Sequence, residues 1–137
     1  MMDVLVHLGI VMHLNGHFER AQALMEEGLA CALAGELGEA KRVYVEALRL
    51  SREIESMPLM LEALAGVAEL NLQTGSYEQA SELSSFLRSH PSSTHETRDR
   101  ADRIVRCTRE YLTEGQIQEI TRNMFGETLD QRVKALL

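Results

Sequence analysis

Apolar residues recur along this chain at spacings of three and four, the period of an amphipathic α-helix. Glycine or proline follows most of these runs and marks the expected helix ends. The first run contains Leu5, Leu8, Val11 and Met12, and we expect it to end at Gly16. Further helices are predicted over about 17–34, 40–54, 58–73 and 77–87. A sixth run has its apolar face over 101–112 and is expected to start near Ser93. Two more helices are predicted between Thr113 and Gly126 and from Thr128 onward. The pattern contains no convincing β-strand.

Polar residues mark several helix starts. The loop His90-Pro91-Ser92-Ser93 separates the fifth run from the sixth, and Ser93 with Glu96 fits a capping box. Thr113 with Gln116 and Thr128 with Gln131 fit the same pattern further along. The helix at 58–73 is apolar nearly all round, so it should be the most buried.

Two stretches of the chain are similar to each other. Residues 5–28 and 64–87 both place a glycine, then an aromatic residue two positions later and a small residue five positions later. Small residues at these positions allow two antiparallel helices to approach closely; they are Gly9, Ala21, Ala68 and Ala80. The stretch from Gly35 to Ala47 repeats the second half of the motif.

These motifs resemble the tetratricopeptide pattern W-x2-L-G-x2-Y…A-x3-F. The resemblance implies an all-α fold of antiparallel helical hairpins, stacked as a short solenoid. The separation from Ala40 to Ala80 fits one unit of the family if that unit has a longer turn in this chain. The separation from Ala21 to Ala40 is too short to contain two helices. Either the 17–34 helix is shared between two units or the array is abbreviated there. Such an array should also bury less surface than a compact globule.

Residues 87–120 resemble the tail that ends tetratricopeptide arrays in bacterial signalling ATPases and transcriptional activators. The resemblance divides the chain into repeats over 1–90 and capping helices of the same domain over 91–137. It also implies a role in bacterial signalling or transcription regulation. The sequence has no GxxxxGK[ST] motif and no basic recognition helix, so neither ATP hydrolysis nor DNA binding is assigned to this chain.

Composition supports a helical protein without a nucleic-acid or membrane partner. Aromatic residues make up 4% of the chain, and the net charge of −7 is opposite to that of a nucleic-acid-binding domain. No apolar run is long enough to span a membrane, and Asp3 stands where a signal peptide needs a basic residue. Cys31 and Cys107 belong to no CxxC motif, which indicates reduced thiols and a cytoplasmic location.

Histidines and cysteines give no strong indication of a chemical site. His13 and His17 have a metal-ligand spacing, but the helix end expected at Gly16 would place them on different faces. His90 and His95 flank a loop without a nearby cysteine in sequence. Cys107 lies among arginines, which lower a thiol pKa, yet a partly buried structural thiol is the expected role.

Charged residues are interpreted as solvated helix faces. The glutamate pairs near Glu26, Glu53 and Glu62 fit such faces better than a catalytic carboxylate pair. Arginines from Arg98 to Arg109 wind around their helix and do not form one stripe. Three acid-first i,i+4 pairs are predicted among them: Glu96–Arg100, Asp99–Arg103 and Asp102–Arg106. No metal or cofactor is expected.

The candidate site is a protein-binding groove. In the tetratricopeptide pattern the first helix of each hairpin lines the concave side. Mapping this onto the chain gives a first set from 3–14 and a second from 62–73: Asp3, Val6, Ile10, His13, Leu14, then Glu62, Ala65, Glu69, Leu72, Gln73. A bound peptide or helix, a second copy of the chain, or the chain's own C-terminal helices could cover the apolar members.

The expected function is therefore non-enzymatic recognition of a protein or peptide segment. Apolar groove contacts would give affinity, and Glu62, Glu69 and Gln73 would select the partner. One alternative is a structural array terminus that self-associates as a homodimer, and a remoter one is a small enzyme of unrecognised type.

Overall fold

The computed structural model describes residues 2–124 and 128–137, and the side chains within these ranges except those of residues 2–15 and 124. The described residues contain α-helices and no β-strand. The helices are α1 (Met2–Leu33), α2 (Leu37–Glu53), α3 (Met57–Gln73), α4 (Tyr77–Ser89), α5 (His95–Thr108), α6 (Glu114–Met124) and α7 (Leu129–Leu136). The all-α fold predicted from sequence is confirmed.

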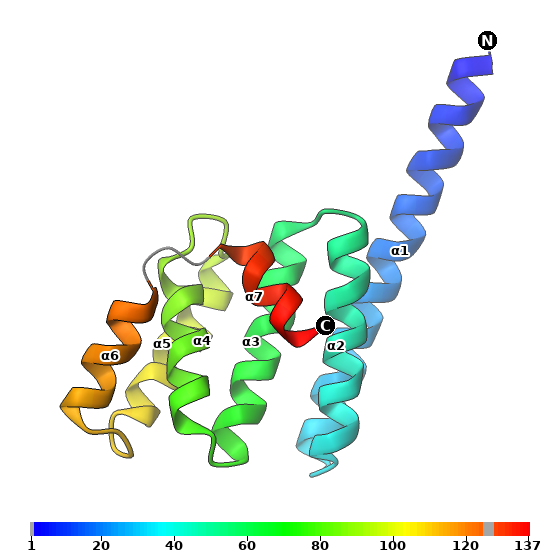
Figure 1. Cartoon of the computed structure of the whole chain (residues 1–137). Helices are drawn as coiled ribbons and strands as arrows, with labels where there is room; N and C mark the ends of the chain where they lie inside the picture. The colour runs from blue at the N-terminus through cyan, green and yellow to red at the C-terminus, as the bar shows by residue number, and fades with distance from the viewer. Residues whose placement is uncertain (1, 125–127) are drawn as a thin grey trace.

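Consecutive helices pack side by side as antiparallel hairpins and form a short solenoid (Figure 1). Each helix from α1 to α5 packs against the helix that follows or precedes it in the chain. In addition, α3 contacts both α1 and α5, so these three helices share one layer. The next helix, α6, packs along α4, while α7 returns to lie across α3 (Figure 1).

The turns after α1, α2 and α3 have the same hydrogen-bond pattern. At the first, the Glu36 amide donates to the Cys31 carbonyl at 2.9 Å and the Gly35 amide donates to the Ala32 carbonyl at 3.1 Å. This is a Schellman motif, in which one residue adopts a left-handed conformation. That residue is Gly35 (φ 81°), Glu55 (φ 55°) or Gly75 (φ 84°).

The equal turns give α2, α3 and α4 a constant spacing of 20 residues between their first residues, Leu37, Met57 and Tyr77. A hairpin therefore takes about 40 residues, as the sequence indicated. The predicted reason, a longer turn, was wrong. The turns are short, and α2 and α3 are each 17 residues long.

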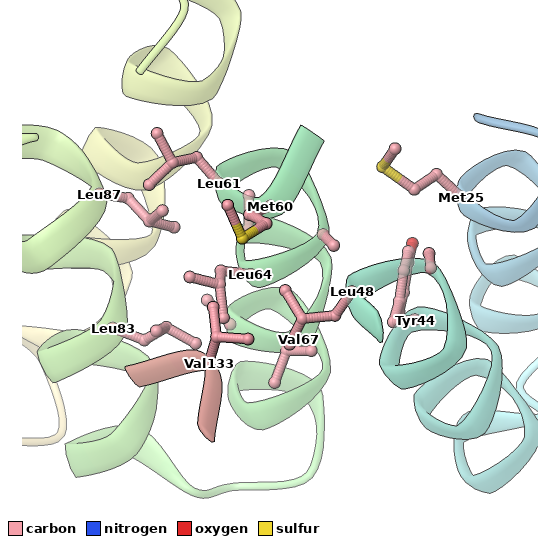
Figure 2. Close-up of a cluster of buried hydrophobic side chains, with 14 of the residues drawn as sticks. Met25, Tyr44, Leu48, Met60, Leu61, Leu64, Val67, Leu83, Leu87 and Val133 are labelled. Atoms are coloured by element: carbon pink, nitrogen blue, oxygen red, sulfur yellow. The ribbon is translucent and has the colours of Figure 1, made fainter. Parts of the chain in front are cut away.

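The core runs along α3, as its apolar sequence predicted. Leu61, Leu64 and Val67 are at most 1% exposed and pack against side chains of α2 and α4 (Figure 2). The predicted small contact residues Ala21, Ala68 and Ala80 are fully buried. Small side chains at these points let neighbouring helices approach closely, which is how the chain forms a core with few aromatic residues.

The helix end predicted at Gly16 was wrong, because α1 continues through it as a single helix of 32 residues. Gly35 and Gly75 end helices with positive φ, whereas Gly16 lies in a helical segment. The apolar positions Val4, Val11, Phe18 and Met25 also recur every seven residues across Gly16. A continuous helix keeps such positions on one side, so the pattern supports an unbroken helix.

Two features of α5 also differ from prediction. Its N-cap is Thr94, whose hydroxyl accepts a hydrogen bond from the Thr97 amide at 3.2 Å. Ser93 turns inward, and its hydroxyl donates to the Leu87 carbonyl at 2.6 Å. The helix then ends at Thr108, short of the predicted Leu112, because a turn follows in which the Tyr111 ring stacks on Tyr77 with centroids 4.0 Å apart.

The last two helices begin as predicted. The Gln116 amide donates to the Thr113 hydroxyl, and the Gln116 side chain accepts from the Thr113 amide. Thr128 and Gln131 form the same capping box at the start of α7. The predicted stop at Gly126 lies outside the described residues.

The molecule has more surface than a compact globule. Its accessible surface is 8467 Å², whereas a compact monomer of this size has roughly 7,200 Å². The expectation of reduced burial in a helical array is confirmed. The α1 helix contributes to the difference, because its N-terminal half projects beyond the other helices (Figure 1).

Candidate functional site

The layer formed by α1, α3 and α5 contains an open groove of about 410 Å³. Its lining combines apolar and charged side chains from four helices: Gln22, Met25, Glu26, Leu29, Tyr44, Glu62, Glu69 and Arg100. Leu29 is 47% exposed, whereas Met25 beside it is 7% exposed. On α1 the groove wall combines the apolar Met25 and Leu29 with Gln22 and Glu26, and it faces a charged wall on α3 and α5.

Tyr44 projects from α2 into the space between α1 and α3, with its hydroxyl pointing toward Met25 (Figure 2). Two helix glycines make room for the ring. A Cβ added at Gly28 would lie 2.8 Å from the Tyr44 ring, and one added at Gly66 would lie 2.6 Å from it. The ring therefore packs directly on the backbones of both helices, and burial raises the pKa of its hydroxyl.

The sequence did not predict this arrangement. Tyr44 was assigned only to the apolar face of its own helix, and Gly66 received no role. The available signal was the glycine inside an otherwise strongly apolar helix. Glycine disfavours a helix interior, so its presence there indicates that another group packs closely against the backbone.

Glu69 and Arg100 form a two-point ion pair between α3 and α5. The guanidinium Nε and Nη2 of Arg100 donate to the two carboxylate oxygens of Glu69, at 2.9 and 3.0 Å. Burial by itself lowers the pKa of Arg100, but the hydrogen bond and charge of Glu69 outweigh it, so the pKa is raised. The pair fixes the charged wall of the groove, because bidentate arginine contacts hold both side chains in one geometry.

The pair also corrects the sequence interpretation of the arginines. Arg100 pairs with Glu69 on another helix in place of the predicted Glu96. Arg98 donates to the His90 and Pro91 carbonyls. Of the predicted i,i+4 pairs, Asp102 with Arg106 is present.

Glu62 is the second acid of the charged wall. Burial against the groove raises the pKa of its carboxyl, while Arg100 acts in the opposite direction and Glu96 adds to the increase. Glu62 thus lies near a cation already paired with Glu69. Of these two carboxylates, that of Glu62 is the more available for contact with a ligand.

The structure brings together some of the predicted groove residues. Glu62 and Glu69 line the groove, whereas Ala65 is fully buried beneath it. Leu72 packs partly against the core, and Gln73 is exposed at the end of α3, outside the groove lining. The first predicted set belongs to the N-terminal half of α1, and its side chains lie outside the described part: Asp3, Val6, Ile10, His13 and Leu14.

Other candidate residues are distributed over the surface. Because α1 is continuous, His13 and His17 share a helix after all, and His17 Nδ1 lies 4.0 Å from a Glu53 carboxylate oxygen. Cys107 is exposed, so its expected partial burial was wrong, and burial raises the pKa of Cys31. Within residues 2–124 and 128–137, no three potential ligands are close enough to hold a metal ion.

His90 and His95 have separate local roles at the loop before α5. The Ser92 amide donates to Nδ1 of His90 at 3.1 Å, and burial lowers the pKa of that ring. His95 lies 3.4 Å from the Asp99 carboxylate on the same helix. His90 therefore contacts the loop, whereas His95 pairs within α5.

Comparison with known proteins identifies no relative: no family model, curated protein or solved structure matches this chain. None of the helices in the described part combines the length and apolar character needed to cross a membrane.

Proposed function

We propose that this chain is a non-catalytic protein-interaction domain of tetratricopeptide type, which binds an apolar segment of another protein in the α1–α3–α5 groove. The observation that carries the proposal is the exposed Leu29 beside Met25 and Tyr44 in an open groove. These apolar side chains suit the apolar face of a helical or extended peptide.

The charged wall supports a selective contact. Because Arg100 is engaged by Glu69 through two hydrogen bonds, the wall presents the carboxylate of Glu62 to a ligand. A peptide that places a lysine or arginine beside its apolar residues would pair with Glu62. Apolar contacts would then give affinity, and charge would set the orientation of the peptide.

The resemblance to tetratricopeptide arrays is supported by the stacked hairpins and by the buried small residues at the matching positions. One property differs from the family pattern. The hairpin repeats at about 40 residues, whereas the pattern has 34. We attribute the difference to the longer helices, and we extend the proposal to the role in bacterial signalling or transcription regulation that the resemblance implies.

A peptide-display library tests the proposal. We expect selection on the whole chain to enrich peptides with apolar residues at helical spacing and an adjacent basic residue. Leu29→Asp should weaken the binding of the selected peptides by at least about tenfold, because a charge would face their apolar side. Leu33→Asp is the matched control, since Leu33 is 81% exposed on the same helix and does not line the groove.

The result for Glu62→Lys separates charge selection from apolar binding. We expect this variant to lose affinity for the basic peptides and to favour acidic ones. Failure to enrich any peptide would contradict the proposed function, as would equal binding of the selected peptides to wild type and to Leu29→Asp.

A further inference from the structure

Two of the three tyrosines in the chain form a stacked pair. Tyr77 is the first residue of α4, and Tyr111 lies in the turn between α5 and α6. Their ring centroids are 4.0 Å apart, and the ring planes differ by 3°. The stack therefore holds together two phenol groups that are distant in sequence.

The two hydroxyl groups lie at the same end of the stack. The pKa of the Tyr111 hydroxyl is raised, chiefly by the charge of ionised Tyr77 and next by a hydrogen bond with that residue. A hydrogen bond requires the two phenol oxygens to be close together. Because the rings are parallel and point the same way, corresponding carbons on the two rings are separated by about the same distance as the centroids. The carbons ortho to the two hydroxyls are therefore neighbours.

The pair is accessible to reagents in solution. Tyr111 is 58% exposed, and Tyr77 is partly buried. An open hollow of about 410 Å³ borders both rings. The third tyrosine, Tyr44, is 3% exposed, and the chain has no tryptophan that would compete for an oxidant. One-electron oxidation of phenol groups is therefore directed to this pair.

Two neighbouring phenols couple when a one-electron oxidant attacks them. Loss of one electron and one proton from each hydroxyl gives two tyrosyl radicals, whose unpaired electrons are shared between the oxygen and the ortho carbons. A C–C bond then forms between one ortho carbon (Cε) of each ring. The hydrogen on each of these carbons moves as a proton to the phenol oxygen, which restores both aromatic rings. The two electrons and two protons that leave reduce one molecule of hydrogen peroxide to two molecules of water.

We propose that Tyr77 and Tyr111 are an oxidative modification site, at which a peroxide-driven one-electron oxidant such as a haem peroxidase forms an intrachain dityrosine. Holding the reacting carbons side by side favours this coupling over collision between chains. The new bond closes a covalent loop that contains all of α4 and α5. The site is separate from the peptide-binding groove, since neither tyrosine belongs to the lining of that groove.

Peroxidase treatment of the full chain tests the proposal. The starting protein carries Cys31→Ser and Cys107→Ser, because thiols also react with peroxide. At low protein concentration we expect dityrosine fluorescence and a single-chain product that is lighter by two hydrogen atoms. Proteolysis and mass spectrometry should place the bond between residues 77 and 111. A bond elsewhere, or dityrosine found mainly in linked pairs of chains, would overturn the proposal.

Phenylalanine variants distinguish the stacked pair from the third tyrosine. Tyr77→Phe and Tyr111→Phe each keep a ring in the stack and remove one phenol, so each should abolish the single-chain product. Tyr44→Phe is the matched control and should give the product in the same yield as the starting protein. A product that persists in Tyr77→Phe or Tyr111→Phe would contradict the assignment.

Unfolding tests whether the native stack causes the coupling. A photochemically generated one-electron oxidant is used here, because it needs no folded enzyme. The yield of the single-chain product from folded protein should exceed the yield in denaturant by at least about tenfold. Equal yields would show that the coupling does not depend on the stack, and they would overturn the proposal.

The stability of the product tests the geometry of the bond. The cross-linked protein should unfold at a higher denaturant concentration than the untreated protein, because the bond restricts the unfolded chain. A lower midpoint would show that the bond distorts the folded turn. That result would contradict the arrangement in which the stack already holds the two carbons in place.

Discussion

At the scale of single residues, the effect of a glycine in this chain depends on what lies beside it. Gly16, Gly28 and Gly66 are all within helices. A Cβ at Gly16 would meet no atom within 4 Å, whereas one at Gly66 would lie 2.6 Å from the Tyr44 ring. The same residue type is therefore dispensable in one helix and required by a neighbouring ring in another.

Gly66→Ala should destabilise the protein by about 1–3 kcal/mol, because the buried Tyr44 ring has to move. Gly16→Ala is the matched control and should stabilise α1 by up to about 1 kcal/mol, the difference in helix propensity. Thermal and denaturant unfolding measure both changes. The loss caused by Gly66→Ala should shrink in a Tyr44→Leu background, and an undiminished loss there would contradict the steric explanation.

The carboxyl of Glu62 gives a prediction for pH dependence. Its folded-state pKa is raised, chiefly by burial, so this carboxyl binds a proton more readily in the folded than in the unfolded protein. Stability from this group is complete below the unfolded pKa of about 4.3 and is lost as pH rises through the higher folded value.

We therefore expect Glu62→Gln to unfold at a higher temperature than wild type at about pH 7, with the difference disappearing near pH 4. Unfolding curves across this range measure the effect. An equal difference at both pH values would show that the raised pKa is not its cause, and Glu26→Gln at the opposite groove wall serves as a control.

At the scale of helices and turns, one turn geometry sets the repeat. The turns at Gly35, Glu55 and Gly75 share their hydrogen bonds, and each requires a left-handed residue. Glycine occupies two of these positions without a steric penalty. Glu55 adopts the same conformation with a side chain, so the middle turn is the strained one.

Glu55→Gly should stabilise the protein by about 0.5–1 kcal/mol, because the left-handed conformation costs a residue with a Cβ about 1–2 kcal/mol and the greater freedom of glycine in the unfolded chain offsets part of the gain. Gly75→Ala places the same strain in the next turn and should destabilise by about 1 kcal/mol. Denaturant midpoints measure both changes. Two shifts of the same sign would contradict the role assigned to the turn.

At the scale of the whole molecule, α7 links parts of the array that are distant in sequence. Asp130 lies 3.4 Å from Arg52 of α2, and Arg132 lies 2.8 Å from Glu82 of α4. Leu129 and Val133 are buried against the core between these contacts. In a solenoid whose helices mainly contact their neighbours, such a bridge couples α2 to α4 across α3.

Val133→Asp should therefore reduce cooperativity as well as stability. Val133 is fully buried, and an unpaired carboxylate there would detach α7. We expect a loss of at least about 2 kcal/mol, with α1 and α2 unfolding at lower denaturant than α4 and α5. Amide exchange resolves the helices separately. Loss of stability with one common transition would exclude the coupling role, and Lys134→Asp, an exposed neighbour, is the control.

The sequence by itself determined the helices, most of their ends and the most buried helix. These features depend on local hydrogen bonding and on the period of apolar residues, which a short segment contains in full. Gly35 and Gly75 thus marked real helix ends, and Thr113 and Thr128 marked real caps. The helix end predicted at Gly16 was wrong because a glycine permits a left-handed turn without requiring one.

The tertiary structure alone decided which distant residues meet. Arg100 had acidic neighbours within its own helix, but packing placed it beside Glu69 on α3. Tyr44 could be recognised as apolar, but its position between Gly28 and Gly66 depends on how closely three helices approach. Sequence patterns define the face of a helix, whereas the partner of a side chain depends on the packing of whole elements, and the groove is a product of that packing.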